Sequence, residues 1–184
     1  MQGTDEQVYK RFLAEGRDED FGILLKRYRE SLTMFLYGYV HNWEDAEDLM
    51  LDAFARTAAG ETVFSGASSF KTWLFAIGRH LAMRHLRKQR VRLSNLEESR
   101  EEDAASPEPD ILRAERDVQL YQARDRLNPE CRQGLFLIYF EDMSREEVCR
   151  VMGKTRRQVY NLTERGRKSL REELVKMGFE YAQY

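Results

Sequence analysis

Two arginines, a phenol and an amide are closely spaced in a basic stretch near the C-terminus. Residues 154–171 hold seven Lys or Arg side chains and a single acid, Glu164. A guanidinium can donate two parallel hydrogen bonds to a guanine edge, and an amide can pair in the same way with adenine. We therefore expect DNA recognition by four side chains at the start of the stretch: Arg156, Arg157, Tyr160 and Asn161.

A helix-turn-helix is predicted to position these side chains. Ser144 and Glu147 form a capping-box pattern that begins one short helix, and Gly153 ends it. Thr155 and Gln158 form a second capping box, which begins the next helix. Two helices joined by a glycine turn are typical of this motif, whose second helix enters the major groove of DNA.

The second helix has an apolar face and a basic face. Val159, either Leu162 or Thr163, Gly166 and Leu170 fall on the apolar face. An ordinary helical hairpin with a solvated basic face is the alternative, but two capping boxes around a glycine turn favour DNA binding. The predicted DNA-binding residues are Lys154, Arg156, Arg157, Gln158, Tyr160, Asn161, Arg165 and Lys168.

Two further charged segments lie in the N-terminal half. Residues 71–92 contain seven Lys or Arg and no acid, whereas ordinary surface helices mix both signs, so a second nucleic-acid surface is favoured. Residues 44–52 contain five acids and no base, for which a solvated helix face is the simplest interpretation. Although the formal net charge is only −2, this segregation indicates at least two kinds of partner.

Hydrophobic periodicity predicts an all-α fold of two small helical domains joined by an acidic flexible linker. The first domain covers residues 1–92 and the second covers residues 119–184. Between them, residues 93–118 lose the apolar stripe and collect acids and prolines, as linkers do.

The first domain is expected to contain four helices. The first helix turns an apolar face that includes Leu13 inward, and Asp18 or Asp20 caps the long second helix. The acidic segment begins the third helix. A loop at 60–69 leads to the fourth helix, which is predicted to end near residue 90.

No catalytic, metal or cofactor site is indicated. His41, His80 and His85 have no nucleophile or paired carboxylate at a motif spacing. Cys131 and Cys149 lack the spacing of a zinc or dithiol site. We therefore expect a protein that is not an enzyme. With no signal peptide and no apolar run of roughly 18 residues, a cytoplasmic protein without direct membrane insertion is also expected.

Two unrelated blocks of the sequence, occurring in order, resemble a known family. They are similar to region 2 and region 4 of the extracytoplasmic-function (ECF) sigma factors of bacterial RNA polymerase, in the sigma-70 superfamily. The resemblance covers nearly all of the chain except the linker. The motifs that carry it are at residues 45–49, 69–74 and 85–88 for region 2, and 127–129, 143–148 and 165–170 for region 4.

The resemblance implies partners for each charged surface. The acidic helix would bind the clamp helices of core RNA polymerase through Asp45, Glu47, Asp48 and Asp52. The helix-turn-helix would bind the −35 promoter element, and an anti-sigma factor would hold the protein inactive. The −10 element would be read and opened by candidates in the loop and the fourth helix: Phe64, Lys71, Arg79, Arg84, Arg87 and Lys88.

Three functions remain open at the level of the sequence. The leading hypothesis is a sigma factor that directs core polymerase to specific promoters and initiates transcription. A stand-alone helix-turn-helix transcriptional regulator is the second, and an interaction protein that sequesters polymerase or a regulator is the third.

Gly166 stands where the family usually has alanine, and a glycine inside a helix costs about 1 kcal/mol relative to alanine.

Overall fold

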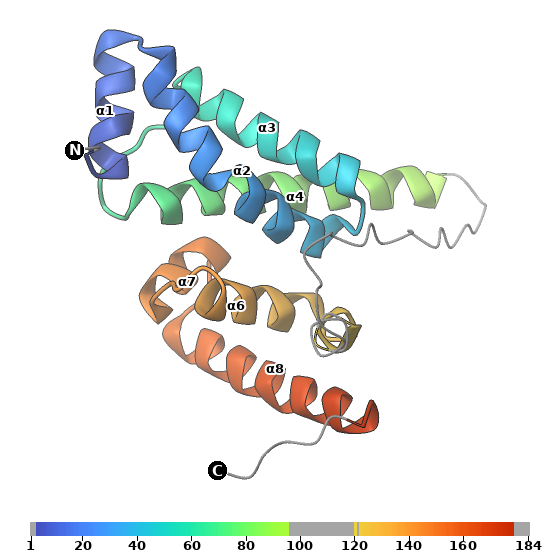
Figure 1. Ribbon diagram of the computed structural model, residues 1–184. Helices are drawn as coiled ribbons and strands as arrows, with labels where there is room; N and C mark the ends of the chain where they lie inside the picture. Colours follow the sequence, from blue (N-terminus) through green and yellow to red (C-terminus); the bar gives the residue numbers. More distant parts are fainter. Residues whose placement is uncertain (1–2, 96–119, 121, 179–184) are drawn as a thin grey trace. The chain divides into compact units, whose positions relative to one another are not determined.

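The computed structural model describes residues 3–95, 120 and 122–178 (Figure 1). The helices whose bounds lie within these residues are α1 Asp5–Glu15, α2 Asp18–Val40, α3 Trp43–Ala58, α4 Phe70–Asn95, α6 Pro129–Tyr139, α7 Arg145–Met152 and α8 Arg156–Lys176. Residues 120 and 122–125 are also helical. The described residues contain no β-strand. The predicted all-α fold class is therefore confirmed.

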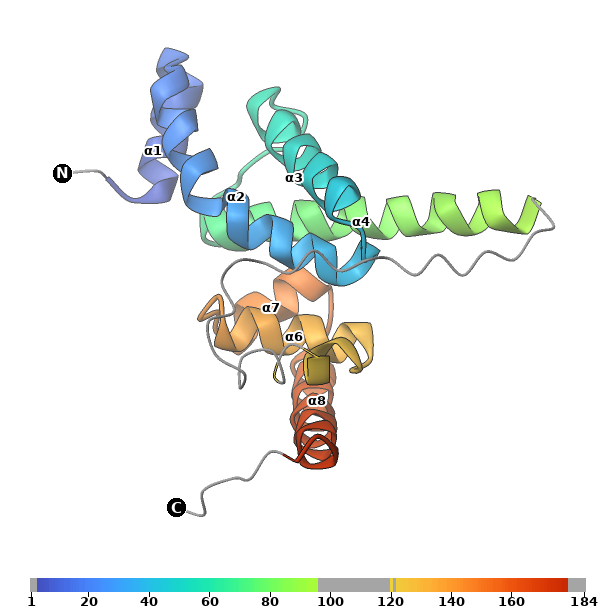
Figure 2. The same ribbon diagram turned by 45° about the vertical axis from the view of Figure 1, so that its right-hand side comes forward.

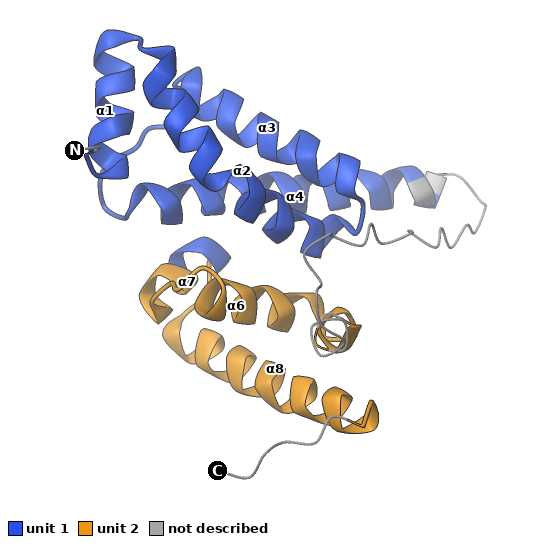
Figure 3. Cartoon of the chain, viewed as in Figure 1, with its two compact units in different colours: residues 1–106, 150–152 blue, residues 107–149, 153–184 orange. Residues whose placement is uncertain are grey.

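The chain divides into two compact units (Figure 3): residues 1–106 with 150–152, and residues 107–149 with 153–184. One boundary of this division falls within α7, between residues 149 and 150. Because α7 is one continuous helix across these residues, all of it forms a single motif with α8. The linker predicted for 93–118 lies outside the described residues except for its first three residues, which continue α4. The fourth helix is longer than predicted because neither glycine nor proline occurs between residues 79 and 95.

Helix α2 is the central element of the first unit and packs against α1, α3 and α4 (Figure 2). Its apolar residues recur every three or four positions, which places Leu24, Leu32 and Phe35 in the core. Phe75 of α4 is also fully buried, and its ring centroid lies 5.2 Å from that of Phe35. This contact between aromatic rings joins α2 to α4.

Two local predictions for α1 and α2 are wrong. Leu13 is 53% exposed, because residues 13–19 all lie on the surface and the last turn of α1 projects beyond the core. Neither Asp18 nor Asp20 caps α2; the N-cap is Arg17, which makes no side-chain capping bond. Asp20 lies within the first turn instead, where its carboxylate accepts a hydrogen bond from Arg11 of α1.

The carboxylate of Asp20 forms a buried link between α1 and α2. It accepts a hydrogen bond of 2.7 Å from Nε of Arg11 and a second from Nη2 of the same guanidinium. Asp20 is only 5% exposed. The hydrogen bonds and the positive charge of Arg11 lower the pKa of Asp20, despite the opposing effect of burial.

This ion pair predicts an acid-sensitive contribution to the stability of the first unit. Because the pKa of Asp20 is lower in the folded chain than in the unfolded chain, the contribution is present above about pH 4 and is lost as the pH falls through the lowered value. We expect Asp20→Asn to flatten the pH dependence of the free energy of unfolding below about pH 4. Tryptophan fluorescence can follow this unfolding, since Trp43 and Trp73 both lie in the first unit.

The matched control is Asp18→Asn, in the same helical turn. Asp18 is exposed and has no ion pair within the described residues, so this variant should keep the parental pH dependence. If Asp20→Asn and the parental chain lose stability in parallel on acidification, the link between Arg11 and Asp20 is not acid-sensitive.

The second unit is built on α6 and α8, which pack against each other. Asn128 caps α6 by accepting a 3.0 Å hydrogen bond from the backbone N–H of Glu130, and Pro129 occupies the first turn. Leu135, Phe136 and Leu137 of α6 are buried. Helix α6 thus supplies the apolar surface on which α8 lies.

Candidate nucleic-acid interface

The helix-turn-helix forms as predicted, with both capping boxes present. In α7 the backbone N–H of Ser144 donates to Oε2 of Glu147 at 2.9 Å, and the N–H of Glu147 donates to Oγ of Ser144 at 3.3 Å. Gly153 ends α7 in the left-handed conformation, with φ of 61°. Thr155 and Gln158 repeat the reciprocal pattern at the start of α8, at 2.9 and 3.3 Å.

The sequence left open whether Leu162 or Thr163 lies on the apolar face of α8, and the structure buries both. Leu162 is 2% exposed and Thr163 is 4% exposed. Gly166 lies against α6 so closely that a Cβ atom there would be 3.2 Å from Cβ of Cys131 and 3.1 Å from Cδ1 of Leu135. This close approach explains why glycine is present in the middle of the helix despite its low helix propensity.

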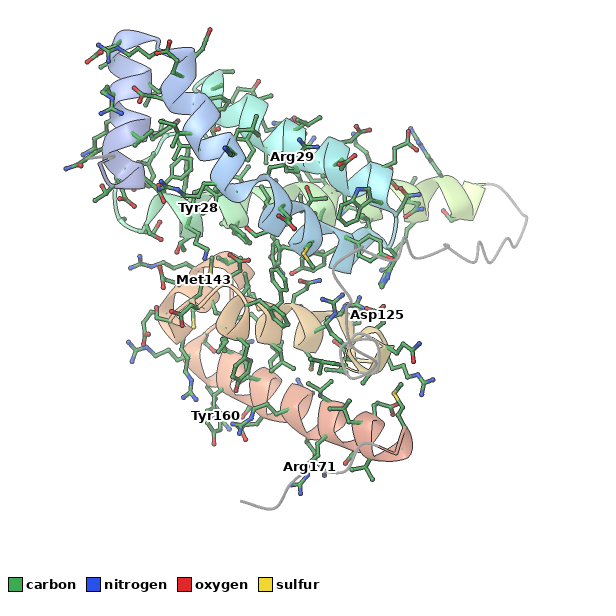
Figure 4. All side chains as sticks on the ribbon, in the orientation of Figure 1. Tyr28, Arg29, Asp125, Met143, Tyr160 and Arg171 are labelled. Atoms are coloured by element: carbon green, nitrogen blue, oxygen red, sulfur yellow. The ribbon has the colours of Figure 1, made fainter. Side chains whose placement is uncertain are left out.

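The opposite face of α8 carries the side chains predicted to bind DNA. Figure 4 shows Tyr160 on this outer face, where it is 49% exposed. Hydrogen-bond donors, hydrogen-bond acceptors and positively charged groups therefore share one exposed helix face. The exposed members of the predicted set are Arg156, Arg157, Gln158, Tyr160, Asn161, Arg165 and Lys168.

Several members of the predicted set already have partners in the second unit, Lys154 and Gln158 among them. Lys154 is half-buried, and its Nζ lies 3.0 Å from Oε1 of Glu130 in α6. Oε1 of Gln158 accepts the capping hydrogen bond from Thr155, which leaves the side-chain NH₂ group as its outward donor. Arg157, by contrast, has no ion pair within the described ranges, so its guanidinium is available to a partner.

Sequence reasoning missed two residues of α7 that contact this face. Nη2 of Arg156 lies 2.8 Å from Oε1 of Glu146, and the guanidinium carbon of Arg145 lies 5.5 Å from the ring centroid of Tyr160. The signal was available, because the first turn of the first helix in this motif lies close to the start of the second. Arg145 and Glu146 directly follow the capping Ser144.

The basic residues of α4 do not form one continuous patch. Arg84, Arg87 and Lys88 are exposed and lie three or four positions apart, so they share a face. Lys71 and Arg79 are half-buried nearer the start of the helix. Lys71 lies 13 positions before Arg84, which corresponds to about 20 Å along the helix axis.

Phe64 is held in an aromatic cluster, which is made of Tyr9, Phe64, Phe70 and Trp73. The ring centroid of Phe64 lies 5.1 Å from that of Trp73 and 5.9 Å from that of Tyr9. The hydroxyl of Tyr9 donates a 2.9 Å hydrogen bond to the carbonyl of Thr57. Phe64 is half-buried in this cluster, so it anchors the loop at 60–69.

Contacts from α1 and from the loop begin α4 at Phe70. The hydroxyl of Ser69 caps the helix by accepting a 3.2 Å hydrogen bond from the N–H of Thr72. The N–H of Phe70 donates to the carboxylate of Glu6 at 2.9 Å. Burial alone would raise the pKa of Glu6. This bond and further hydrogen bonds outweigh the effect of burial, so the pKa of Glu6 lies below its usual value.

Three of the four acids predicted to bind polymerase have basic neighbours within the first unit. A carboxylate oxygen of Asp45 lies 3.5 Å from Nε2 of His85, one of Glu47 lies 3.7 Å from Nη2 of Arg29, and one of Asp52 lies 2.9 Å from Nε of Arg56. Asp48 is exposed and has no ion pair in the part of the chain that the structure describes. Leu51, which is 52% exposed, lies beside these acids on α3.

Within residues 3–95, 120 and 122–178, no group of three or more His, Cys, Asp or Glu side chains could hold a metal ion. Cys131 and Cys149 are free thiols, and burial raises the pKa of Cys131. No helix in these ranges is both long enough and apolar enough to cross a bilayer.

Two family models match the chain and together cover about two thirds of it: Sigma-70 region 2 over residues 24–92 and Sigma-70 region 4 over residues 117–170. The chain is 27% identical over 178 residues to RNA polymerase sigma-H factor of Pseudomonas aeruginosa, covering 89% of this chain and 92% of that one. It is 28% identical over 164 residues to ECF RNA polymerase sigma factor SigX of Bacillus subtilis, covering 85% and 84%.

A solved structure has the same fold. Sigma factor RpoE of Bartonella quintana, in complex with the anti-sigma factor NepR, superposes with a TM-score of 0.66 at 23% identity. The match covers 85% of this chain and 97% of that chain.

The fold, the helix-turn-helix and the two regional matches define a DNA-binding transcription-initiation protein of the sigma-70 superfamily. Within it, the chain belongs to the ECF sigma factors of bacterial RNA polymerase. A stand-alone regulator is not favoured, because a helix-turn-helix alone leaves the match to region 2 unexplained.

Proposed function

We propose that this sigma factor binds the −35 element as duplex DNA through α8, and reads and opens the −10 element through the loop at 60–69 and α4. The observation that carries the proposal is the ordered outer face of α8. Arg156, Arg157 and Asn161 are exposed in its first two turns, where a recognition helix meets base edges. Arg165 and Lys168 lie further along and suit phosphates.

For the −10 element, α4 offers cations to the backbone of an opened strand. Arg84, Arg87 and Lys88 share one exposed face, which suits the regular charge of a nucleic-acid backbone. Phe64 in the preceding loop, Lys71 near the start of α4 and Arg79 further along the helix remain candidates. Phe64 would act chiefly by holding the loop in shape, because its ring is packed among other aromatic rings.

Core polymerase is the proposed partner of α3, through Asp45, Glu47, Asp48 and Asp52. Of these, Asp48 offers a carboxylate without an internal ion pair in the described ranges. We expect Asp48→Lys to weaken binding to core polymerase about tenfold, because the partner must then meet a charge of the wrong sign. Titration of a fluorescently labelled chain with core polymerase measures this change.

Glu19→Lys is the matched control for Asp48→Lys, since Glu19 is an exposed acid outside the proposed polymerase surface. It makes the same change of charge and should bind core polymerase like the parental chain. Equal affinities of Asp48→Lys and the parental chain would rule out Asp48 as a polymerase contact.

Reconstitution tests the function as a whole. Adding the chain to core polymerase should produce transcripts that start at defined promoters, and omitting either component should abolish them. Tight binding of promoter duplex by the chain alone, with no gain of transcription in the presence of polymerase, would instead support the stand-alone regulator.

The remaining proposals concern the setting of the protein. We infer a cytoplasmic protein that is not an enzyme and requires no cofactor, with domains over 1–92 and 119–184 and a linker over 93–118. An anti-sigma factor is a proposed partner. The solved structure of sigma factor RpoE contains one, the anti-sigma factor NepR. CnrH, which has the same fold at a TM-score of 0.62 and 20% identity over 94% of this chain and 95% of that chain, was solved in complex with the cytosolic domain of CnrY.

A further inference from the structure

The first turn of α7 touches the outer face of α8 at two neighbouring points. Glu146 forms an ion pair with Arg156 at 2.8 Å, and the guanidinium of Arg145 lies over the ring of Tyr160 at 5.5 Å. Arg156 and Tyr160 are one helical turn apart, so the two contacts follow one edge of α8. This edge leads into the part of α8 that faces base pairs in a helix-turn-helix.

The ion pair between Glu146 and Arg156 has little to contribute to folding. The side chains are 52% and 78% exposed, and ion pairs with such exposure stabilise proteins weakly. The carboxylate of Glu146 restricts the long side chain of Arg156, which would otherwise sample many rotamers. Glu146 contacts only Nη2 of Arg156, and a guanidinium has five N–H donors, so other donors of Arg156 remain for a second partner.

We propose that Glu146 is a specificity-determining residue, which holds the guanidinium of Arg156 in position to read a guanine in the −35 element. The inference rests on the proposed role of α8 in binding this element. An arginine fixed by a carboxylate presents its remaining donors in one orientation, and a guanine edge offers the matching pair of acceptors, O6 and N7. Glu146 is thus a positioning residue for Arg156.

The negative charge of Glu146 also has a cost for binding DNA in general. A carboxylate close to the duplex repels phosphates, while its effect on Arg156 favours one base pair. Removing the carboxylate should therefore change affinity and selectivity in opposite directions. A residue with only a structural role would lower both together.

Selection from randomised duplexes tests the proposal. Holoenzyme reconstituted from core polymerase and the full chain is used to enrich promoter DNA randomised across the −35 element. The parental chain should enrich guanine at a position read by Arg156, and Arg156→Ala should lose that preference. Glu146→Ala should reduce the same preference about tenfold, leave the other positions unchanged, and raise affinity for non-promoter duplex about twofold at low salt.

Two further variants serve as references. Glu146→Gln keeps the shape and a neutral acceptor, so its preference for guanine should lie between those of the parental chain and Glu146→Ala. Glu164→Ala removes a similar exposed partner of an arginine, since Glu164 lies 3.1 Å from Arg167 on α8. It should leave base preference unchanged because Arg167 lies three turns beyond Arg156.

An unchanged base profile for Glu146→Ala overturns the inference, and so does a profile weakened equally at every position. Either result leaves the proposed function intact if the parental chain enriches a −35 sequence. If the parental chain enriches none, the proposal that α8 reads the −35 element fails, and the role of Glu146 fails with it.

Discussion

Replacing Arg156 and Arg157 together with alanine should lower transcription from a promoter with a −35 element by about a hundredfold or more. Both guanidinium groups are exposed in the first turn of α8, the part of a recognition helix that reaches base edges. Each well-placed arginine contact contributes about 1–3 kcal/mol of discrimination between bases. Run-off transcription by reconstituted holoenzyme measures the loss.

The matched control is Lys176→Ala, at the far end of the same helix. Nζ of Lys176 lies 2.6 Å from Glu173, so this variant removes a positive charge from α8 without touching its first turn. Its transcription should stay close to the parental level. Transcription at the parental level in the double arginine variant would show that these two side chains do not read the −35 element.

Replacing Gly166 with valine should destabilise the second unit by about 2–3 kcal/mol. The Cβ of any side chain would approach Cβ of Cys131 to 3.2 Å and Cδ1 of Leu135 to 3.1 Å. Cβ of Cys131 is attached directly to the backbone of α6, so the helices must separate to admit a larger residue. Separation of the helices would also release α8, and DNA binding should fall with stability.

Amide hydrogen exchange is the suitable measurement, because it reports on each helix separately. Both tryptophans lie in the first unit, so their fluorescence does not report on α8. Exchange should accelerate in α6 and α8 of Gly166→Val and remain unchanged in α1 to α4. Unchanged protection of α6 and α8 would show that the helix contact can adjust.

Gly22→Ala provides the opposite control. Gly22 lies inside α2, and apart from the neighbouring backbone of α2 and the two adjacent residues no atom lies within 4 Å of the position that its Cβ would occupy. Alanine should therefore stabilise α2 by about 0.5–1 kcal/mol through helix propensity alone. The contrast between these glycines separates the conformational cost of glycine from its value in close packing.

Local chemistry made the helix-turn-helix predictable from the sequence. A capping box is complete within four residues, so the starts of α7 and α8 and the outward position of Arg156 and Arg157 could be inferred without knowledge of the fold. The 3.6-residue period likewise placed Val159 on the inner face of α8.

Features that depend on the neighbouring helix could not be predicted in the same way. Gly166 has the propensity of a helix breaker, and only the position of α6 explains its presence. Asp20 follows the pattern of a helix cap but pairs with Arg11 of another helix. The burial of Phe75 also depends on a partner, since its ring meets Phe35 of α2.

The aromatic cluster around Tyr9 shows that the segment matched by the region 2 model is shorter than the segment that folds together. The match to region 2 begins at residue 24, yet Tyr9 packs against Phe64, Phe70 and Trp73, and Glu6 holds the first N–H of α4. A fragment cut at the start of the family match would lack the Tyr9 ring that Phe64, Phe70 and Trp73 pack against, and would leave the start of α4 without its bond to Glu6. The shortest fragment that preserves the loop must therefore begin ahead of α1, at a boundary set by physical contact rather than by shared ancestry.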